Sequence, residues 1–119
     1  MDLRQGHVCT AEIKAERGPT KMRPVVVVSM DDEISRDDFV RVVAVSTSFN
    51  EPLSADQVEL PWERTGRCVT GLTRRSVAVC TWLDKLPRSS IRELKGFVPA
   101  PILLRILQRL KETLRLPDD

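Results

Sequence analysis

The sequence predicts a mainly β (α+β) fold, a small and strongly curved antiparallel barrel that a C-terminal α-helix closes. Two observations predict it. Many short runs of β-branched and apolar residues come first, separated by turn residues, and a single helical pattern comes last. No repeat or linker interrupts this order, and 119 residues suit one domain, residues 1–119, with one core. Apolar residues make up 41% of the chain, which is enough for a packed core and argues against disorder.

The strand around which the chain is organised is the valine run at 25–28, within the stretch 21–29. Valine is stiff at χ1 and fits a pleated backbone, and alternate valines point to opposite faces. Both faces of this strand are therefore apolar, which predicts a central strand covered on both sides. Pro24 cannot donate to a β-ladder, so pairing is expected to begin beyond it or to leave it at the strand start.

Further strands and one helix follow from the same patterns. The expected strands are residues 6–13, 39–46, 57–60, 76–80 continuing towards 83, and 94–98. Polar or turn-rich connections separate them at 14–22, 31–38 (which can hold one helical turn), 47–52, 62–73 and 86–91. After Pro99, apolar residues recur at intervals of three and four, which predicts a helix with one buried face and an end at Pro117. The buried face consists of Leu103, Ile106, Leu107, Leu110 and Leu114.

Charge is balanced overall but concentrated locally. Nineteen basic and 17 acidic residues leave a net charge of +2, too little for a general polyanion-binding surface. Aromatic residues are only 4% and tyrosine is absent, which argues against a base-stacking platform. Arg23 lies at the mouth of the valine strand, where its planar fork matches phosphate oxygens, although a solvated arginine beside a strand has the same pattern. The local basic cluster, which can grip phosphates or form a solvated loop, is Lys14, Arg17, Lys21 and Arg23.

Cysteine and histidine usage favours a cytoplasmic protein without a metal or other cofactor. Cys9, Cys68 and Cys80 are an odd number with no Cys-x-x-Cys pair, and we expect reduced thiols. His7 is the single histidine, so a zinc site is not expected. No run approaches the ~18 apolar residues of a membrane span, and the start of the sequence lacks a signal-peptide pattern, so no membrane contact is expected.

Five segments, in order along nearly the whole chain, resemble the MazF/PemK family of toxins. Gly-His-Val at 6–8, a polar loop, and Arg-Pro-Val-Val-Val-Val-Ser at 23–29 resemble the family's opening of Gly-Asp-hydrophobic, a loop, and an Arg-Pro-hydrophobic strand ending in Ser. The other four are Val-Val-Ala-Val-Ser-Thr-Ser at 42–48, Gly-Leu-Thr-Arg-Arg-Ser-Val-Ala-Val-Cys at 71–80, Leu-Asp-Lys-Leu-Pro-Arg-Ser at 83–89, and Leu-Lys-Gly-Phe-Val at 94–98 before the leucine-rich helix.

The resemblance implies an SH3-like barrel and the activity of a cytoplasmic endoribonuclease. Members of this family are toxins of type II toxin–antitoxin systems. They act as homodimers, cut single-stranded RNA at short sequences without metal, and are held inactive by an antitoxin protein. The expected products are a 2′,3′-cyclic phosphate and a 5′-hydroxyl. The family's catalytic Arg falls on Arg23, and its catalytic Thr falls on Ser46, with Thr47 as an adjacent candidate.

Physical chemistry makes these implied roles reasonable. Attack by a 2′-hydroxyl builds negative charge on the phosphorane oxygens, which Arg23 can stabilise through two parallel hydrogen bonds. A hydroxyl at Ser46 or Thr47 can position the reacting phosphate. Glu16 is the nearby loop carboxylate that can serve as a general base. The candidate RNA-binding residues are Lys14, Arg17, Lys21 and Arg74.

Three departures from the family pattern leave alternatives open. His7 stands where the family usually has Asp, Thr81-Trp82 stands where it usually has Asp-Gln, and Ser46 replaces Thr while keeping the hydroxyl. The first two are compatible with altered RNA specificity or with a degenerate site. The alternative functions are therefore a catalytically inactive or regulatory barrel, or a CcdB-like protein-binding toxin that poisons gyrase. Those gyrase poisons contact gyrase through a C-terminal Trp-Gly-Ile. Residues 116–119 here are Leu-Pro-Asp-Asp, which argues against that mechanism.

Overall fold

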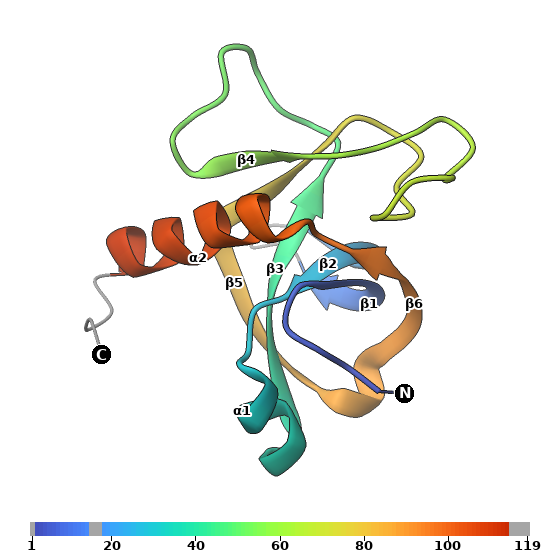
Figure 1. Cartoon of the computed structure of the whole chain (residues 1–119), viewed down its shortest axis with the longest axis vertical. Coiled ribbons are helices and arrows are strands. Elements are labelled where there is room, and N and C mark those ends of the chain that lie inside the picture. The colour runs from blue at the N-terminus through green and yellow to red at the C-terminus, as the bar shows by residue number, and fades with distance from the viewer. Residues whose placement is uncertain (1, 15–17, 115–119) are drawn as a thin grey trace.

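The computed structural model describes residues 2–14 and 18–114 of the chain, as a curved sheet with two α-helices (Figure 1). The elements are β1 (His7–Lys14), β2 (Thr20–Val27), α1 (Asp31–Arg36), β3 (Phe39–Ser46), β4 (Gln57–Leu60), β5 (Ser76–Pro87), a 3₁₀ turn (Arg88–Ser90), β6 (Ile91–Phe97) and α2 (Ala100–Leu114). The predicted sequence of many strands followed by one long helix is confirmed, and α1 is the single helical turn or so allowed for 31–38.

The strands form one antiparallel sheet in the order β4-β5-β3-β2-β1-β6. The sheet curls strongly, and α2 lies across β5 and β4 (Figure 1). The predicted antiparallel sheet with a C-terminal helix is therefore confirmed. The curl stops short of a closed ladder, because β4 and β6 remain the two edges and do not pair with each other in the described part of the chain.

The two faces of the sheet carry two separate apolar cores. Val26 and Val28 point into the core beneath α2, which we call the α2-side core, together with Ile106 and Leu110. Val25, Val27 and the α1 side chain Ile34 belong to the opposite core, the α1-side core. The four valines are 0–9% exposed. The prediction of a central strand covered on both faces is confirmed, since β2 lies between β1 and β3.

The helix α2 buries the stripe that the sequence predicts. Ile106 and Leu110 are buried, and Leu103 and Leu107 pack partly buried against the same core, whereas the off-stripe Leu104 is 66% exposed. The side chain of Leu114 and the expected helix end at Pro117 lie outside the described residues.

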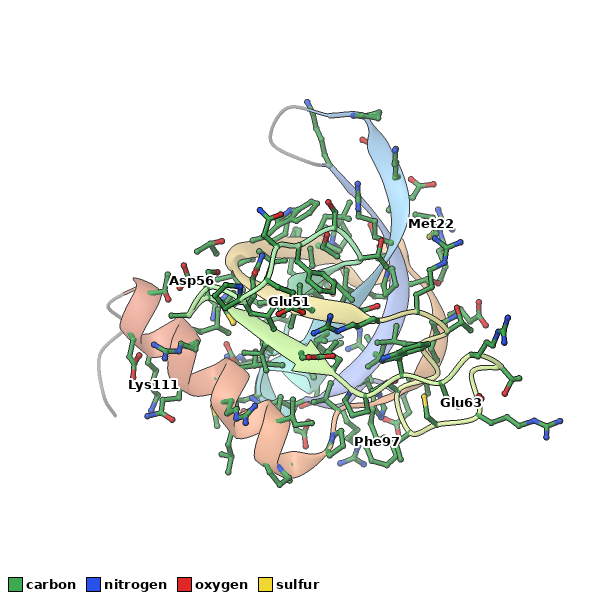
Figure 2. The ribbon with its side chains drawn as sticks, turned by 90° about the horizontal axis from the view of Figure 1, so that it is seen from above. Met22, Glu51, Asp56, Glu63, Phe97 and Lys111 are labelled. Carbon is green, nitrogen blue, oxygen red and sulfur yellow. The ribbon has the colours of Figure 1, made fainter. Side chains whose placement is uncertain are left out.

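A long segment between β4 and β5, residues 61–75, spans the gap between the two sheet edges. The Phe97 N–H at the end of β6 donates to the Val69 carbonyl (2.8 Å). Glycine is required on both sides of this crossing. Gly96 has the Val69 backbone where a Cβ would stand, and Gly71 has a φ of +72° with the Lys95 carbonyl oxygen 2.6 Å from where its Cβ would stand. In Figure 2, Glu63 of this segment and Phe97 of β6 lie on the same side of the molecule.

Three strand boundaries differ from the expectation. Residue Pro24 lies inside β2, because pairing with β1 runs on to Lys14–Thr20, whereas pairing with β3 begins only at Val25, beyond the proline that lacks an N–H. The strand expected at 76–80 runs unbroken to Pro87, so the turn expected at 86–91 shrinks to 88–90. The last strand begins at Ile91 instead of Leu94, because β6 follows the bent β1 through two register shifts.

Candidate functional site

Arg23 lies in the middle of β2, at the end of the region that β3 covers. Its Cα partner on β1 is the buried Ala11. The ladder between β2 and β3 ends at the pair Val25–Ala44, so Arg23 stands two residues beyond the last β3 pair and is half-buried. By strand alternation its side chain shares a face with Val25, which belongs to the α1-side core. A permanent cation thus sits at the rim of an apolar core.

The guanidinium of Arg23 rests against the ring of Trp82 on β5. Its Cζ lies 5.2 Å from the ring centroid, within the range of a cation–π contact. Its Nε is buried and has no hydrogen-bond partner, the one such side-chain nitrogen or oxygen in the described part of the chain. Within residues 2–14 and 18–114, no carboxylate pairs with Arg23. Its positive charge is therefore held in place without being neutralised.

An irregularity in β5 aims Trp82 at Arg23. On β3, Val43 pairs with Leu83 and the next residue, Ala44, pairs with Val79, so residues 80–82 of β5 are left without β3 partners. The bulge reverses the side-chain alternation: Cys80 points into the α2-side core, and Trp82, which strict alternation would place with it, packs on the α1-side core. The sequence pattern of residues 76–83 gives no sign of this change in alternation, so it does not predict that Trp82 contacts Arg23.

Ser46 and Thr47 lie at the end of β3 and in the bend after it. The half-buried Ser46 occupies the position that matches Arg23, two residues beyond Ala44 on the same face. Its Oγ accepts the Ser48 N–H (3.0 Å) and donates to the Ser48 carbonyl (3.1 Å), which forms a tight local turn. Thr47 is exposed, and its hydroxyl has no hydrogen-bond partner among the residues described.

The predicted basic cluster is divided between two faces of the β1–β2 hairpin, which extends past the rest of the sheet (Figure 2). Lys21 is two residues from Arg23 and shares its face, whereas Lys14, whose β2 partner is Thr20, lies on the other face. Both lysines are exposed. The candidate base Glu16 and the candidate RNA-binding Arg17 lie outside the described residues.

The two arginines before β5 have different environments. Arg75 donates to both carboxylate oxygens of Glu59 (2.8 and 3.2 Å), pairs with Glu51, and lies over the ring of Phe49. These contacts raise the pKa of Arg75 and, through its hydrogen bonds, lower the pKa of Glu59. Arg75 therefore connects Glu51, in the segment after Thr47, to Glu59 of β4. Glu51 is labelled in Figure 2. Arg74 is exposed and pairs with no carboxylate in the described residues, so it remains available to an anion.

Other classes of site are not seen in the described residues. They contain no group of three or more His, Cys, Asp or Glu side chains that could hold a metal ion. None of the helices described is long and apolar enough to cross a membrane. His7, at the start of β1, accepts the Arg4 N–H at Nδ1 (3.1 Å), which gives it a local role at the N-terminal turn.

Solved structures resemble this fold over nearly its whole length. A crystal structure of MazE–MazF from Deinococcus radiodurans matches with a TM-score of 0.74 and 19% identity, covering 98% of this chain and 100% of that chain. The Mycobacterium tuberculosis toxin MazF-mt6 matches with a TM-score of 0.74 and 18% identity over 94% and 99% of the two chains. An endoribonuclease in complex with its cognate antitoxin, from a mycobacterial species, matches with a TM-score of 0.68 and 16% identity over 99% and 98%. At these identities the likeness shows the shared fold.

A comparison with curated protein sequences finds no match. The sequence model of one family, described as the PemK-like, MazF-like toxin of type II toxin–antitoxin systems, matches residues 4–114. This match spans every strand and both helices described above. The chain therefore belongs to the PemK-like, MazF-like toxins of type II toxin–antitoxin systems.

Proposed function

We propose that this toxin is a metal-independent endoribonuclease that cleaves single-stranded RNA, with Arg23 and Ser46 or Thr47 at the reacting phosphate. Toxins of this family are generally endoribonucleases. The observation that carries the proposal is the state of Arg23: half-buried, fixed on a central strand, and without a neutralising carboxylate in the described residues. A held but uncompensated guanidinium is what a developing phosphorane charge requires.

The reaction is an intramolecular transesterification. The 2′-oxygen bonds to the adjacent phosphorus, the bond from phosphorus to the 5′-oxygen breaks, and a 2′,3′-cyclic phosphate and a 5′-hydroxyl result. The proton of the 2′-hydroxyl passes to a general base, for which the sequence offers Glu16, and the 5′-oxygen takes up a proton as it leaves. Arg23 binds the non-bridging oxygens through its terminal nitrogens, because its Nε is covered.

The hydroxyl groups at the end of β3 position the phosphate for this reaction. The Ser46 hydroxyl donates to the Ser48 carbonyl in this structure and turns from it to donate to a phosphate oxygen, whereas the Thr47 hydroxyl has no partner among the described residues. Lys21 on the hairpin and Arg74 before β5 supply further exposed positive charge for the RNA backbone, which orients the strand without reading its sequence. The remaining candidate RNA-binding residues are Lys14, on the other face of the hairpin, and Arg17, which lies outside the described residues.

The first experiment is to incubate the purified chain with a long single-stranded RNA in EDTA and to sequence the new RNA ends. Defined cuts that leave 5′-hydroxyl and cyclic phosphate ends are expected. No cleavage, combined with inhibition of gyrase, would instead favour a protein-binding toxin. No cleavage and no gyrase inhibition would leave a barrel without either activity.

The assignment of Arg23 has its own test. Arg23→Ala should abolish cleavage while the chain stays folded, and Arg23→Lys should also be poor because a point charge cannot reproduce the planar fork. Arg36→Ala is a suitable control, since Arg36 is an exposed α1 arginine that pairs with its neighbour Asp37. Retained cleavage by a folded Arg23→Ala variant would remove Arg23 from the mechanism.

We also propose that an antitoxin protein inhibits this chain by covering the RNA site. A structural relative was solved as an endoribonuclease in complex with its cognate antitoxin. A surface that attracts phosphates also attracts carboxylates, so an acidic, amphipathic segment can bind here and fold on binding. Lys21→Glu should weaken both RNA and antitoxin binding in a competition titration. If saturating antitoxin peptide leaves RNA cleavage unchanged, inhibition occurs elsewhere.

A two-fold homodimer is the proposed assembly. Several large apolar side chains remain exposed on one copy, among them Phe97 (52%) and Leu94 (44%) of β6. A second copy can cover such side chains in a self-complementary interface. Light scattering at micromolar concentration should give twice the monomer mass, and a monomer would contradict the proposal.

A further inference from the structure

We infer that Trp82 is a positioning residue that holds the Arg23 guanidinium for phosphate binding, through the bulge at residues 80–82. This inference rests on the proposed ribonuclease function, and the experiment below separates the two. It concerns the position where the sequence departs from the family pattern, since Thr81-Trp82 replaces the usual Asp-Gln. In this inference the departure supplies Arg23 with an aromatic support.

The bulge gives Trp82 a fixed platform. The residues on either side of it, Val79 and Leu83, are paired to β3, so the unpaired stretch is anchored at both ends. The Trp82 ring packs against the α1-side core. This core contains Ala11, which is the β1 partner of Arg23, and Val25, which lies on the same face of β2 as Arg23. The ring therefore packs against the core and also contacts the guanidinium, with the Arg23 Cζ 5.2 Å from the ring centroid.

An aromatic partner suits this purpose better than a carboxylate would. A carboxylate orients an arginine through hydrogen bonds, but it also cancels the charge and occupies the donors that a phosphate needs. A ring face attracts the cation and leaves the terminal nitrogens free. The Arg75 side chain shows the contrast within the same chain, because Glu59 and Glu51 hold it as a structural clamp.

The buried Nε explains why the ring itself is needed. A covered N–H without an acceptor is unfavourable, and no described residue accepts from the Arg23 Nε. In the proposal, the π-face of Trp82, whose centroid lies 5.2 Å from the Arg23 Cζ, serves as the weak acceptor for this N–H. An aliphatic side chain at position 82 would fill part of the space of the ring. It would have no π-face to attract the guanidinium, so the Arg23 side chain would no longer be held in this position.

The first arm of the test measures the contact without using activity. The Arg23 Nε–Hε resonance is assigned in a ¹H–¹⁵N spectrum by its loss in Arg23→Lys. In the native chain and in Trp82→Phe, ring currents should displace it from the ordinary arginine position, and Trp82→Leu should return it there. An unchanged resonance in Trp82→Leu would overturn the inference.

The second arm measures RNA cleavage. Trp82→Leu should lower kcat on the order of tenfold, with a smaller change in KM because the phosphate-binding charge remains, whereas Trp82→Phe should stay within about threefold of the native rate. The matched control is Phe39→Leu, which removes the ring that contacts Lys85 at the opposite end of the β3–β5 ladder. This control should keep native activity, and melting temperatures confirm that each variant is folded.

The outcomes separate the two claims. If Arg23→Ala is inactive while Trp82→Leu cleaves at the native rate, Trp82 does not position Arg23 and the proposed ribonuclease function stands. If the native chain cleaves no RNA, or if folded Arg23→Ala cleaves normally, the proposed roles fail, and with them the catalytic purpose of the contact. Loss of both the displaced resonance and kcat in Trp82→Leu, with both kept in Trp82→Phe, supports the inference.

Discussion

Arg23 on β2 and Ser46 on β3 occupy matching positions, each two residues beyond Val25–Ala44, the last pair of their ladder. Antiparallel strands place such residues on the same face, so the guanidinium and the hydroxyl flank the point where the two strands part. A phosphate placed between them meets a cation on one side and a hydroxyl on the other. This relationship yields a prediction that separates Ser46 from its neighbour.

Ser46→Ala should reduce RNA cleavage by about a hundredfold, because a positioned donor at a developing charge contributes on this scale. Ser46→Thr should stay near the native rate, since the hydroxyl is kept. Thr47→Ala should lose less than Ser46→Ala, because Thr47 follows the strand and is exposed. Initial cleavage rates of the three folded variants are the measurement. A larger loss in Thr47→Ala would transfer the role to Thr47.

The ion pair between Arg75 and Glu59 should stabilise the fold in a pH-dependent way. Hydrogen bonds from Arg75 hold the pKa of Glu59 below its ordinary value. A carboxyl with a lowered folded-state pKa contributes stability above that ordinary value, and the contribution disappears as pH falls through the lower folded value. The Tm of Glu59→Gln should therefore lie below the native Tm at pH 7, and the difference should narrow as pH falls through the folded-state pKa of Glu59. The difference should be small, because the pair is exposed.

Glu93→Gln serves as the control for that pH series. Glu93 is exposed on β6 and pairs with no basic residue in the described part of the chain. The Tm of this variant should follow that of the native chain across the whole pH range. A Tm deficit for Glu59→Gln that stays constant as pH is lowered from 7 until the native chain itself unfolds would show that the ion pair is not the source of the effect.

Gly96→Ala should destabilise the chain by about 3 kcal/mol or more, because the Val69 backbone occupies the position of the added methyl group. Gly66→Ala is the matched control. Gly66 has a φ of +80°, but its nearest contacts would lie at 3.4 Å, so only the left-handed backbone penalty of about 1–2 kcal/mol applies. Urea unfolding of both variants measures the difference. Equal losses would show that the crossing of segment 61–75 over β6 can relax.

Cys68 should be the one thiol that reacts in the folded protein. Burial raises the pKa values of Cys9 and Cys80 to about 11, so at pH 8 roughly one thiol in a thousand is ionised at each site. Cys68 is only partly buried. Iodoacetamide at pH 8 should add one label per native chain at Cys68 and three per chain in urea, as read by mass spectrometry. Comparable labelling of Cys9 in the native chain would contradict the packing of the α1-side core.

The fold was largely predictable from local patterns. The valine run has apolar side chains on both faces, and the stripe from Leu103 to Leu110 has the period of a helix, so each pattern specifies its own burial. Where strands pair was less predictable. Pro24 lies inside β2 because it is paired to β1 alone, and nothing local distinguishes that situation from a strand start.

The candidate site was proposed from motifs that name single residues, Arg23 and Ser46, and the structure places these two at matching positions while their roles stay predictions. Contacts between residues that are distant in sequence could not be predicted in this way. The contact between Arg23 and Trp82 depends on a bulge of three residues in β5, a strand that is distant from Arg23 in sequence. The hydrophobic pattern of residues 76–83 gives no sign of this bulge. The two carboxylate partners of Arg75 likewise come from another strand and a loop, so sequence spacing gave no sign of the clamp.

The crossing of residues 61–75 over the end of β6 also bears on self-association. An exposed edge strand offers unpaired N–H and C=O groups to any extended chain, and such edges start strand addition and fibril growth. At this end of β6 the Phe97 N–H already donates to the Val69 carbonyl. The Val69 backbone also lies directly against Gly96, which leaves no space there for a second strand to pair. The chain thereby covers this end of the edge strand with its own irregular segment. Loosening this crossing, as Gly96→Ala is expected to do, should make the protein prone to aggregate.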